Sequence, residues 1–180
     1  MNVEELINRY TAGERNFAGS ELKPVRDWSK VLEYLESTNP NFKGFDLRGI
    51  NLRGADLYLA YLPGANLSGA DLTGANLNQA NLIGVNLTET ILTGANLRDT
   101  MLGGSNLTKT YLESANLTRT SLRGADLFQA NLSSSILIET NFGSVKNWNM
   151  VIFDRTFFWQ VILPDGTVEV GPTYKSYWEK

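Results

Sequence analysis

Acidic side chains are the first residues to consider for chemistry, because the chain has no cysteine and no histidine. Four aspartates stand apart from one another, at the same point of a repeating unit: Asp46, Asp56, Asp71 and Asp126. A carboxylate at such a point can bond the backbone of a neighbouring turn, so we interpret these residues as structural. The many serines and threonines lack a histidine or a convincing lysine base, so no nucleophilic centre is predicted. We therefore expect no enzyme activity, no cofactor and no metal site.

A five-residue period positions these aspartates. From Phe42 to Phe142 every fifth residue is leucine or phenylalanine, 21 times in succession. The residue before it is asparagine or aspartate in 15 of these units, and the second residue after it is glycine in 10. An α-helix repeats at about 3.6 residues and a flat strand at about 2, so neither explains the period. The chain must instead coil in short, similar steps.

The composition of one unit indicates how it folds. In Ala65–Gly69 the residues two apart on an extended segment point the same way, so Ala65 and Leu67 face inward and Asn66 faces outward. The last two positions turn the chain, where glycine accepts a positive φ. No unit can bury its own leucine, so stability must come from stacking coil on coil.

Units such as Ala65-Asn66-Leu67-Ser68-Gly69 and Ala70-Asp71-Leu72-Thr73-Gly74 resemble the A-(D/N)-L-x-x unit of the pentapeptide-repeat family. The flanking segments 12–17 and 163–167 look like those of cyanobacterial members. The resemblance implies an all-β solenoid, a right-handed quadrilateral parallel β-helix with four units in each coil. With it we expect a short N-terminal helix, one inserted helix and a hairpin-like C-terminal cap.

The length of 180 residues fits one solenoid domain. We divide it into an N-terminal cap helix at 2–12, a first partial coil at 15–24, a helical excursion at 25–39, regular pentads at 40–144, a phase-shifted last coil at 145–165 and a C-terminal cap at 166–180.

The helix predicted at 25–39 has one apolar stripe, which must pack against something. The stripe consists of Trp28, Val31, Leu32 and Leu35. We predict that it docks on outward-facing apolar residues of the coil side that begins at Phe42. Those residues are Tyr61, Pro63 and Ile83.

After Phe142 the period slips by one residue. The segment 163–167 reads as a tight turn, and Val168 with Val170 then returns as the second strand of a hairpin. Aromatic residues gather in this part of the chain, where we predict a C-terminal cap or, alternatively, a dimer contact. They are Trp148, Phe153, Phe158, Tyr174, Tyr177 and Trp178.

Six units lack asparagine or aspartate at the outward position. The substituted residues are Tyr61, Ile91, Met101, Tyr111, Ser121 and Ile136. Ile91 and Tyr111 are one coil apart on one side, so they are expected to form a small exposed apolar strip. Together with Met101 they are the candidate partner surface.

Charge and hydropathy exclude several classes of function. The net charge is −3, and residues 40–144 hold eight acidic and seven basic side chains, so no nucleic-acid-binding surface is predicted. The chain has no run of 18 apolar residues, so we expect no membrane span, and no membrane is among the expected partners. The N-terminus does not resemble a signal peptide. The cytoplasm is the expected location.

Two functions follow from the resemblance. Some cyanobacterial members of the family regulate other proteins by contact, which favours a non-catalytic interaction, scaffold or regulatory protein with an unidentified protein partner. Other members mimic DNA and bind type II topoisomerases, which needs a continuous acidic surface. Basic residues such as Arg48, Arg98 and Arg119 interrupt the acids here, so mimicry is the less favoured alternative. A monomer and an end-to-end homodimer both remain open.

Overall fold

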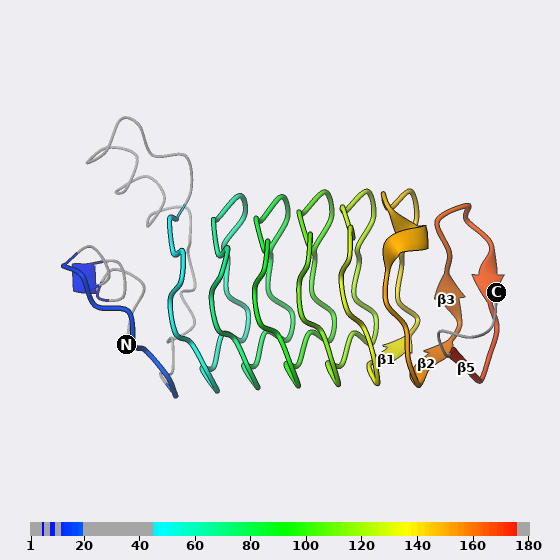
Figure 1. Ribbon diagram of the computed structural model, residues 1–180, viewed down its shortest axis with the longest axis horizontal. Coiled ribbons are helices and arrows are strands. Elements are labelled where there is room, and N and C mark those ends of the chain that lie inside the picture. The colour runs from blue at the N-terminus through cyan, green and yellow to red at the C-terminus, as the bar shows by residue number, and fades with distance from the viewer. Residues whose placement is uncertain (1–4, 6–7, 10–11, 20–44, 176–180) are drawn as a thin grey trace.

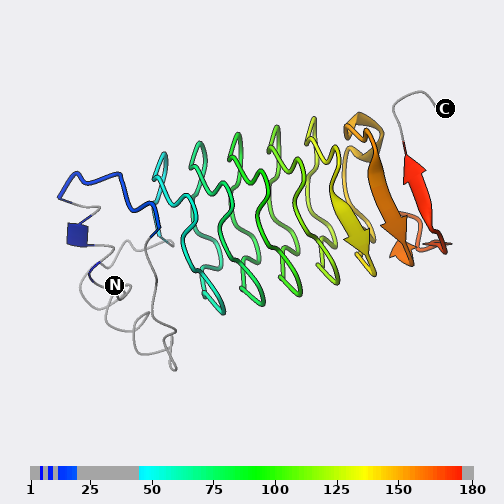
Figure 2. The same cartoon turned by 90° about the horizontal axis from the view of Figure 1, so that it is seen from below.

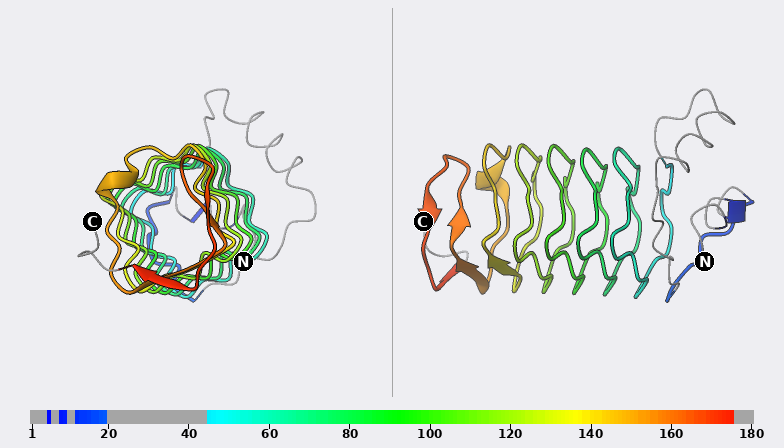
Figure 3. Two further views of the ribbon diagram at one scale, coloured as in Figure 1. Left: turned by 90° about the vertical axis from the view of Figure 1, so that its right-hand side faces the viewer. Right: turned by 180° about the vertical axis from the view of Figure 1, so that it is seen from behind.

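The computed structural model describes residues 5, 8–9, 12–19 and 45–175. In the longest of these segments the chain winds into a stack of short coils along one axis (Figure 1). A view along that axis shows a four-sided outline (Figure 3). The backbone pairing explains this outline. Bridges in the repeat join residues 20 positions apart in parallel, as Asp46 joins Asn66, so one coil takes four five-residue units.

We name each side of the coil by its first outward residue in the repeat. The Asp46 face carries Asp46, Asn66, Asn86, Asn106, Asp126 and Lys146, and the Asn51 face carries Asn51, Asp71, Ile91, Tyr111, Asn131 and Ile152. The Asp56 face carries Asp56, Asn76, Asn96, Asn116, Ile136 and Phe157, and the Tyr61 face carries Tyr61, Asn81, Met101, Ser121, Asn141 and Ile162.

The interior of the tube consists of layers of buried leucine. Leu67 and Leu87, one coil apart, are fully buried, and so is the small residue Ala65 two positions before Leu67. The backbone of Asn86, the outward residue of the next coil, joins the two coils. The Leu67 amide donates to the Asn86 carbonyl at 2.8 Å, and the Asn86 amide donates to the Ala65 carbonyl at 2.9 Å. The predicted alternation of inward and outward positions is therefore confirmed.

Each corner is a tight turn that needs one residue with a positive φ. At the first regular corner the Ile50 amide donates to the Leu47 carbonyl at 3.2 Å, and Gly49 has a φ of 64°. Such a turn favours glycine, because other residues are strained in the left-handed region. Leu59, with a φ of 58°, shows that the stack also imposes this conformation on larger residues.

Buried threonines replace alanine at several inward positions. The hydroxyl of Thr90 donates to the Leu67 carbonyl at 2.7 Å, and that of Thr120 donates to the Leu97 carbonyl at 2.6 Å. Each hydroxyl thus finds an acceptor in the preceding coil. A buried hydroxyl without a partner would be costly, so these bonds explain why a polar residue is tolerated inside the tube.

The coil register changes near the C-terminal end. Asp126 still pairs with Lys146, as the regular period requires, but Asn131 pairs with Ile152, which is one position later than the period predicts. The extra residue falls where the chain makes a 3-10 helix, η1 (Trp148–Met150).

Aromatic rings fill the tube beyond this change of register. The ring centroids of Phe142 and Trp148 are 4.9 Å apart, those of Trp148 and Phe153 are 5.0 Å apart, and those of Phe153 and Phe158 are 5.4 Å apart. Phe158 is fully buried. These larger side chains close the core where the leucine layers end.

Five short strands complete the fold at this end, four of them labelled in Figure 1. They are β1 (Ile136–Ile138), β2 (Thr156–Trp159), β3 (Val161–Ile162), β4 (Val168–Glu169) and β5 (Thr173–Lys175). Strand β2 pairs in parallel with β1, while β5 returns antiparallel along β2. Strands β3 and β4 form an antiparallel hairpin, which confirms the predicted hairpin-like cap. Strands β4 and β5 pair with β3 and β2, so they cover backbone edges that the parallel coils would leave unpaired at this end.

At the N-terminal end, Glu5, Asn8 and Arg9 are helical, within the range predicted for the cap helix. Asn16 pairs in parallel with Asn51, so this coil is longer than a regular one by the length of three further units. The predicted excursion at 25–39 lies outside the described residues, as does its apolar stripe of Trp28, Val31, Leu32 and Leu35. Its docking stays a prediction.

Candidate protein-interaction surface

Ion pairs hold most of the charged side chains on the outside of the tube. Six of the nine basic residues between 45 and 175 lie within 4.0 Å of a carboxylate. The pairs are Arg48–Asp46, Arg53–Asp71, Lys109–Glu89, Arg119–Asp99, Arg155–Asp154 and Lys175–Glu169. Acidic and basic groups therefore alternate over the described surface.

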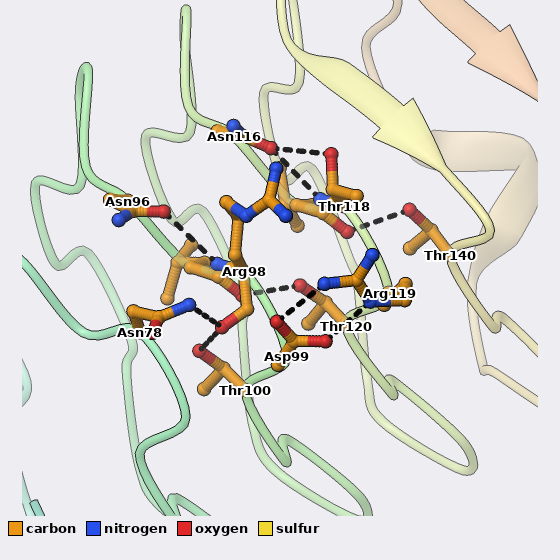
Figure 4. Close-up of polar contacts among 12 residues, drawn as sticks. Asn78, Asn96, Arg98, Asp99, Thr100, Asn116, Thr118, Arg119, Thr120 and Thr140 are labelled. Atoms are coloured by element: carbon orange, nitrogen blue, oxygen red, sulfur yellow. Dashed lines mark hydrogen bonds and ion pairs between the residues drawn. The ribbon is translucent and has the colours of Figure 1, made fainter. Parts of the chain in front are cut away.

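The pair between Asp99 and Arg119 is joined by two hydrogen bonds (Figure 4). Both nitrogens of the guanidinium fork donate to the carboxylate, Nε to Oδ1 at 2.6 Å and Nη2 to Oδ2 at 2.9 Å. These hydrogen bonds from Arg119 lower the pKa of Asp99 below its usual value, and they raise the pKa of Arg119. The pair links two successive coils at one corner.

The four aspartates of the repeat have the structural role that the sequence predicts. Asp126 Oδ1 accepts the Phe128 amide at 3.0 Å, and Asp71 Oδ1 accepts the Thr73 amide at 3.0 Å. Asp46 and Asp56 make the same contact to the amide two residues on. Among the residues that the structure describes, no three acidic side chains gather as a metal-binding group.

The strip formed by Ile91 and Tyr111 lies on the Asn51 face. The two residues pair in parallel, and their exposed fractions are 36% and 46%. Asparagine or aspartate precedes and follows them along the same face, at Asp71 and Asn131. The strip is thus a two-coil apolar interruption of a polar side, which we call the Ile91 strip.

Met101 and the residues predicted to receive the inserted helix lie on the Tyr61 face. Met101 and Ile83 are exposed, whereas Tyr61 and Pro63 are half-buried. Met101 pairs with Asn81 and Ser121, so it is on a different side of the tube from Ile91 and Tyr111. It does not extend the Ile91 strip into one continuous surface.

A larger apolar surface covers the C-terminal part of the Asp56 face. Strands β1, β2 and β5 lie side by side there, as the yellow, orange and red arrows of Figure 2 show. Their outward side chains form what we call the sheet patch: Ile136, Ile138, Phe157, Trp159 and Tyr174. The rings of Phe157 and Tyr174 are 5.2 Å apart, and Tyr174 is 67% exposed.

Sequence reasoning missed the sheet patch, although it noted Ile136 and Tyr174 separately. Phe157 lies one position beyond the regular period from its partner Ile136, and β5 is antiparallel, so the five-residue repeat connects neither Phe157 nor Tyr174 to Ile136. A signal was present nonetheless. Once the slipped phase assigns Phe158 to the interior, Phe157 and Trp159 must face outward.

The aromatic residues predicted as a cap or dimer contact separate into two groups. Phe158 is buried in the core, and the partly buried Trp148 and Phe153 pack against the core in succession, which is the position of a cap. Tyr174 points outward into the sheet patch. Tyr177 and Trp178 lie outside the described residues.

The model of the family described as pentapeptide repeats matches this sequence with eight copies, over residues 38–74, 70–108 and 105–143. The chain belongs to the pentapeptide-repeat family. The fold is accordingly the right-handed quadrilateral β-helix of that family. No curated protein matches the sequence significantly.

Solved structures of other pentapeptide-repeat proteins resemble this one. HetL, a protein involved in heterocyst differentiation regulation from the cyanobacterium Nostoc sp. strain PCC 7120, is 24% identical, with 94% of this chain and all of HetL covered and a TM-score of 0.56. Rfr23 from the cyanobacterium Cyanothece 51142 is 23% identical over 84% of this chain and all of Rfr23, with a TM-score of 0.36. The Nostoc protein alr5209 is 32% identical over 72% of this chain and 80% of its own, with a TM-score of 0.29.

The described helical residues include no helix long and apolar enough to span a bilayer.

The surface of this pentapeptide-repeat protein offers two kinds of feature within the described residues. One is a polar exterior in which most charges are paired. The other is exposed apolar side chains on three of the four faces.

Proposed function

We propose that this pentapeptide-repeat protein is a non-catalytic interaction protein that holds a protein partner on an apolar part of its outer surface. The binding surface would then resemble other protein–protein interfaces, with apolar side chains buried at its centre and polar groups around them. The expected location remains the cytoplasm.

One observation carries this proposal. Ile91, Tyr111 and Ile136 are exposed at outward positions where the repeat usually places asparagine or aspartate. Each substitution gives up a hydrogen bond of the kind that Asp126 makes to the Phe128 amide, so stability of the coil gives no reason for it. An apolar residue that adds nothing to the core is well suited to contact another molecule.

Paired charge favours this function over DNA mimicry. A DNA mimic needs acidic groups in unbroken succession, as phosphates occur along a duplex. On the Asn51 face, Arg53 pairs with Asp71, and at the corner that precedes this face Lys109 pairs with Glu89. A protein partner can tolerate this mixture of charges. The positively charged DNA-binding site of a topoisomerase, in contrast, would be repelled by the basic side chains of this surface.

Affinity capture from cells of the source organism tests the proposal. Three baits are compared with the original protein: Ile91→Asn with Tyr111→Asn, Ile136→Asn with Trp159→Asn, and a control pair on the Asp46 face, Thr88→Asn with Thr108→Asn. All four proteins must show the same thermal unfolding before capture. The control pair changes as many residues to the same amino acid on a face without exposed aliphatic residues.

We expect at least one captured protein to disappear with an apolar-surface bait and to persist with the control bait. A set of captured proteins identical for all four baits would contradict the proposed function. Loss of the same protein from the control bait as well would show that the contact does not depend on the apolar residues.

A further inference from the structure

The Asp56 face changes its chemistry from one end of the tube to the other. In its first coils the outward side chains bond one another, since Asn76 Nδ2 donates to Asp56 Oδ1 at 2.8 Å and Asn96 Nδ2 donates to Asn76 Oδ1 at 3.1 Å. In its last coils the same positions carry the sheet patch. The face therefore combines a polar half, whose groups satisfy one another, with an apolar half that is open to a partner.

Arg98 lies on this face between the two halves. It follows Asn96 by two residues, so its side chain projects from the same face, and Figure 4 shows its guanidinium beside Asn116 and Thr118. Within the part of the chain that the structure describes, Arg98 forms no ion pair at 4.0 Å, although six of the nine basic residues between 45 and 175 do. The adjacent carboxylate of Asp99 is bound through both oxygens by Arg119.

The distance from Arg98 to the sheet patch is set by the coil stacking. Asn96, Asn116 and Ile136 are bridged in succession, so Arg98 is two coils from Ile138. At roughly 4.8 Å for each coil, this is roughly 10 Å along the face. One extended or helical segment of a partner can span that distance with roughly three to seven residues.

Resting on the proposed function, we infer that the Asp56 face binds a segment of another protein that places apolar side chains on the sheet patch and a carboxylate on Arg98. A guanidinium binds a carboxylate through two parallel hydrogen bonds, which gives such a contact a defined orientation. The apolar anchors supply the buried area and Arg98 sets the register of the partner along the face.

A second copy of the chain is the less suitable occupant. It would have to supply the carboxylate, and the acidic groups near its own sheet patch are engaged by basic neighbours. Asp154 pairs with Arg155, Glu169 pairs with Lys175, and Glu139 interacts with Arg119. The charge of Arg98 is thus better matched by an acidic segment of a different protein.

A peptide library identifies the preferred ligand even though the partner protein is unidentified. Random dodecapeptides displayed on phage are selected on the full chain, and the enriched peptides are synthesised and measured by fluorescence anisotropy. We expect enriched sequences that combine aromatic or aliphatic residues with aspartate or glutamate. We further expect Trp159→Ala to weaken their binding, whereas Ile83→Ala, a change of an exposed apolar residue on the Tyr61 face, should leave it unchanged.

The role of Arg98 is tested by charge reversal. Arg98→Glu should weaken binding roughly tenfold or more, as loss of a charge-assisted hydrogen-bonded pair implies. The control is Arg123→Glu, because Arg123, like Arg98, forms no ion pair among the described residues, but it is exposed and lies on the Tyr61 face. A peptide whose acidic residue is changed to lysine should bind Arg98→Glu better than it binds the original protein. Circular dichroism on heating verifies that each variant is folded.

Several results would overturn the inference. They are the absence of any enriched peptide, enriched peptides without an acidic residue, and binding that is insensitive to Arg98→Glu. A doubled mass in light scattering that is lost in Trp159→Ala would identify a second copy as the occupant, and would also overturn it. If the apolar-surface baits still lose a captured protein in any of these cases, the proposed function stands and only the acidic partner segment is wrong.

Discussion

At the scale of single residues, the corners of the coil impose one demand that most amino acids meet poorly. The third residue of each four-residue turn has a positive φ, which costs a side chain other than glycine about 1–2 kcal/mol. Gly103 and Gly104 occupy one corner, but only Gly104 has a positive φ, of 65°. A comparison of alanine substitutions at these two glycines therefore separates the cost of a positive φ from the effect of losing the flexibility of glycine.

We predict that Gly104→Ala lowers the free energy of unfolding by about 1 kcal/mol or more. An added Cβ at Gly104 would meet no atom within 4 Å, so the loss would come from backbone strain alone. The control Gly103→Ala would bring its Cβ 3.6 Å from the Arg123 carbonyl, an ordinary contact, and should change stability by less than about 0.5 kcal/mol. Urea unfolding measures both, and equal losses would contradict the strain argument.

The ion pair of Asp99 and Arg119 predicts a dependence on pH. The pKa of Asp99 is lowered in the folded protein, mainly by hydrogen bonds from Arg119. The stabilisation is therefore complete above the unfolded-state pKa of about 3.9, and it is lost as the pH falls through the lower folded-state pKa. Arg119→Gln should raise the pKa of Asp99 and cause only a small loss of stability at pH 7, because the pair is partly exposed.

Carbon-13 NMR of the Asp99 carboxyl group during an acid titration measures this pKa directly. Arg123→Gln is the control, since it removes the same charge from another face of the tube. An unchanged pKa in Arg119→Gln would show that another group holds the carboxylate in its charged form.

At the scale of elements, the C-terminal cap depends on the close approach of β5 to β2. Gly171 precedes β5, and a Cβ at this position would clash with the carbonyl oxygen of Phe158 in β2. The backbone leaves no room for a side chain there, so the strand could pair only after moving. Gly166, in the turn before β4, also has a positive φ but open space around it.

We therefore predict that Gly171→Ala costs about 2 kcal/mol or more and loosens β5, whereas Gly166→Ala costs about 1 kcal/mol from strain alone. Hydrogen exchange followed by mass spectrometry should show faster exchange at Phe158 and at Thr173–Lys175 in Gly171→Ala only. The prediction fails if the two variants lose equal stability and β5 keeps its protection.

Sequence reasoning succeeds for the regular coils because each five-residue unit is a local pattern with one physical solution. The inward Leu67, the outward Asn66 and the turn at Gly69 follow from residue spacing alone. The sheet patch did not follow, because the pairing of β5 with β2 joins segments of opposite direction across a non-repeating turn. The buried hydroxyl bonds, such as that of Thr120, were missed for another reason: their acceptor lies in the preceding coil and leaves no mark in the local pattern.

At the scale of the whole molecule, the interior specifies the fold and the exterior is free to bind. A solenoid gains its stability from contact between neighbouring coils, so buried leucines matter in every coil and outward side chains contribute little to the core. Strand β1 places the two roles side by side. Leu137 is fully buried, and Ile136, the residue before it, is 39% exposed.

Equilibrium unfolding of two single variants in β1 tests this separation most directly. We predict that Leu137→Ala lowers the free energy of unfolding by about 2–5 kcal/mol, because it opens a cavity in the leucine layers. Ile136→Ala should lower it by less than about 1 kcal/mol, as expected for a surface change that leaves the core intact. Equal losses for the two neighbours, or a larger loss for Ile136→Ala, would contradict the account.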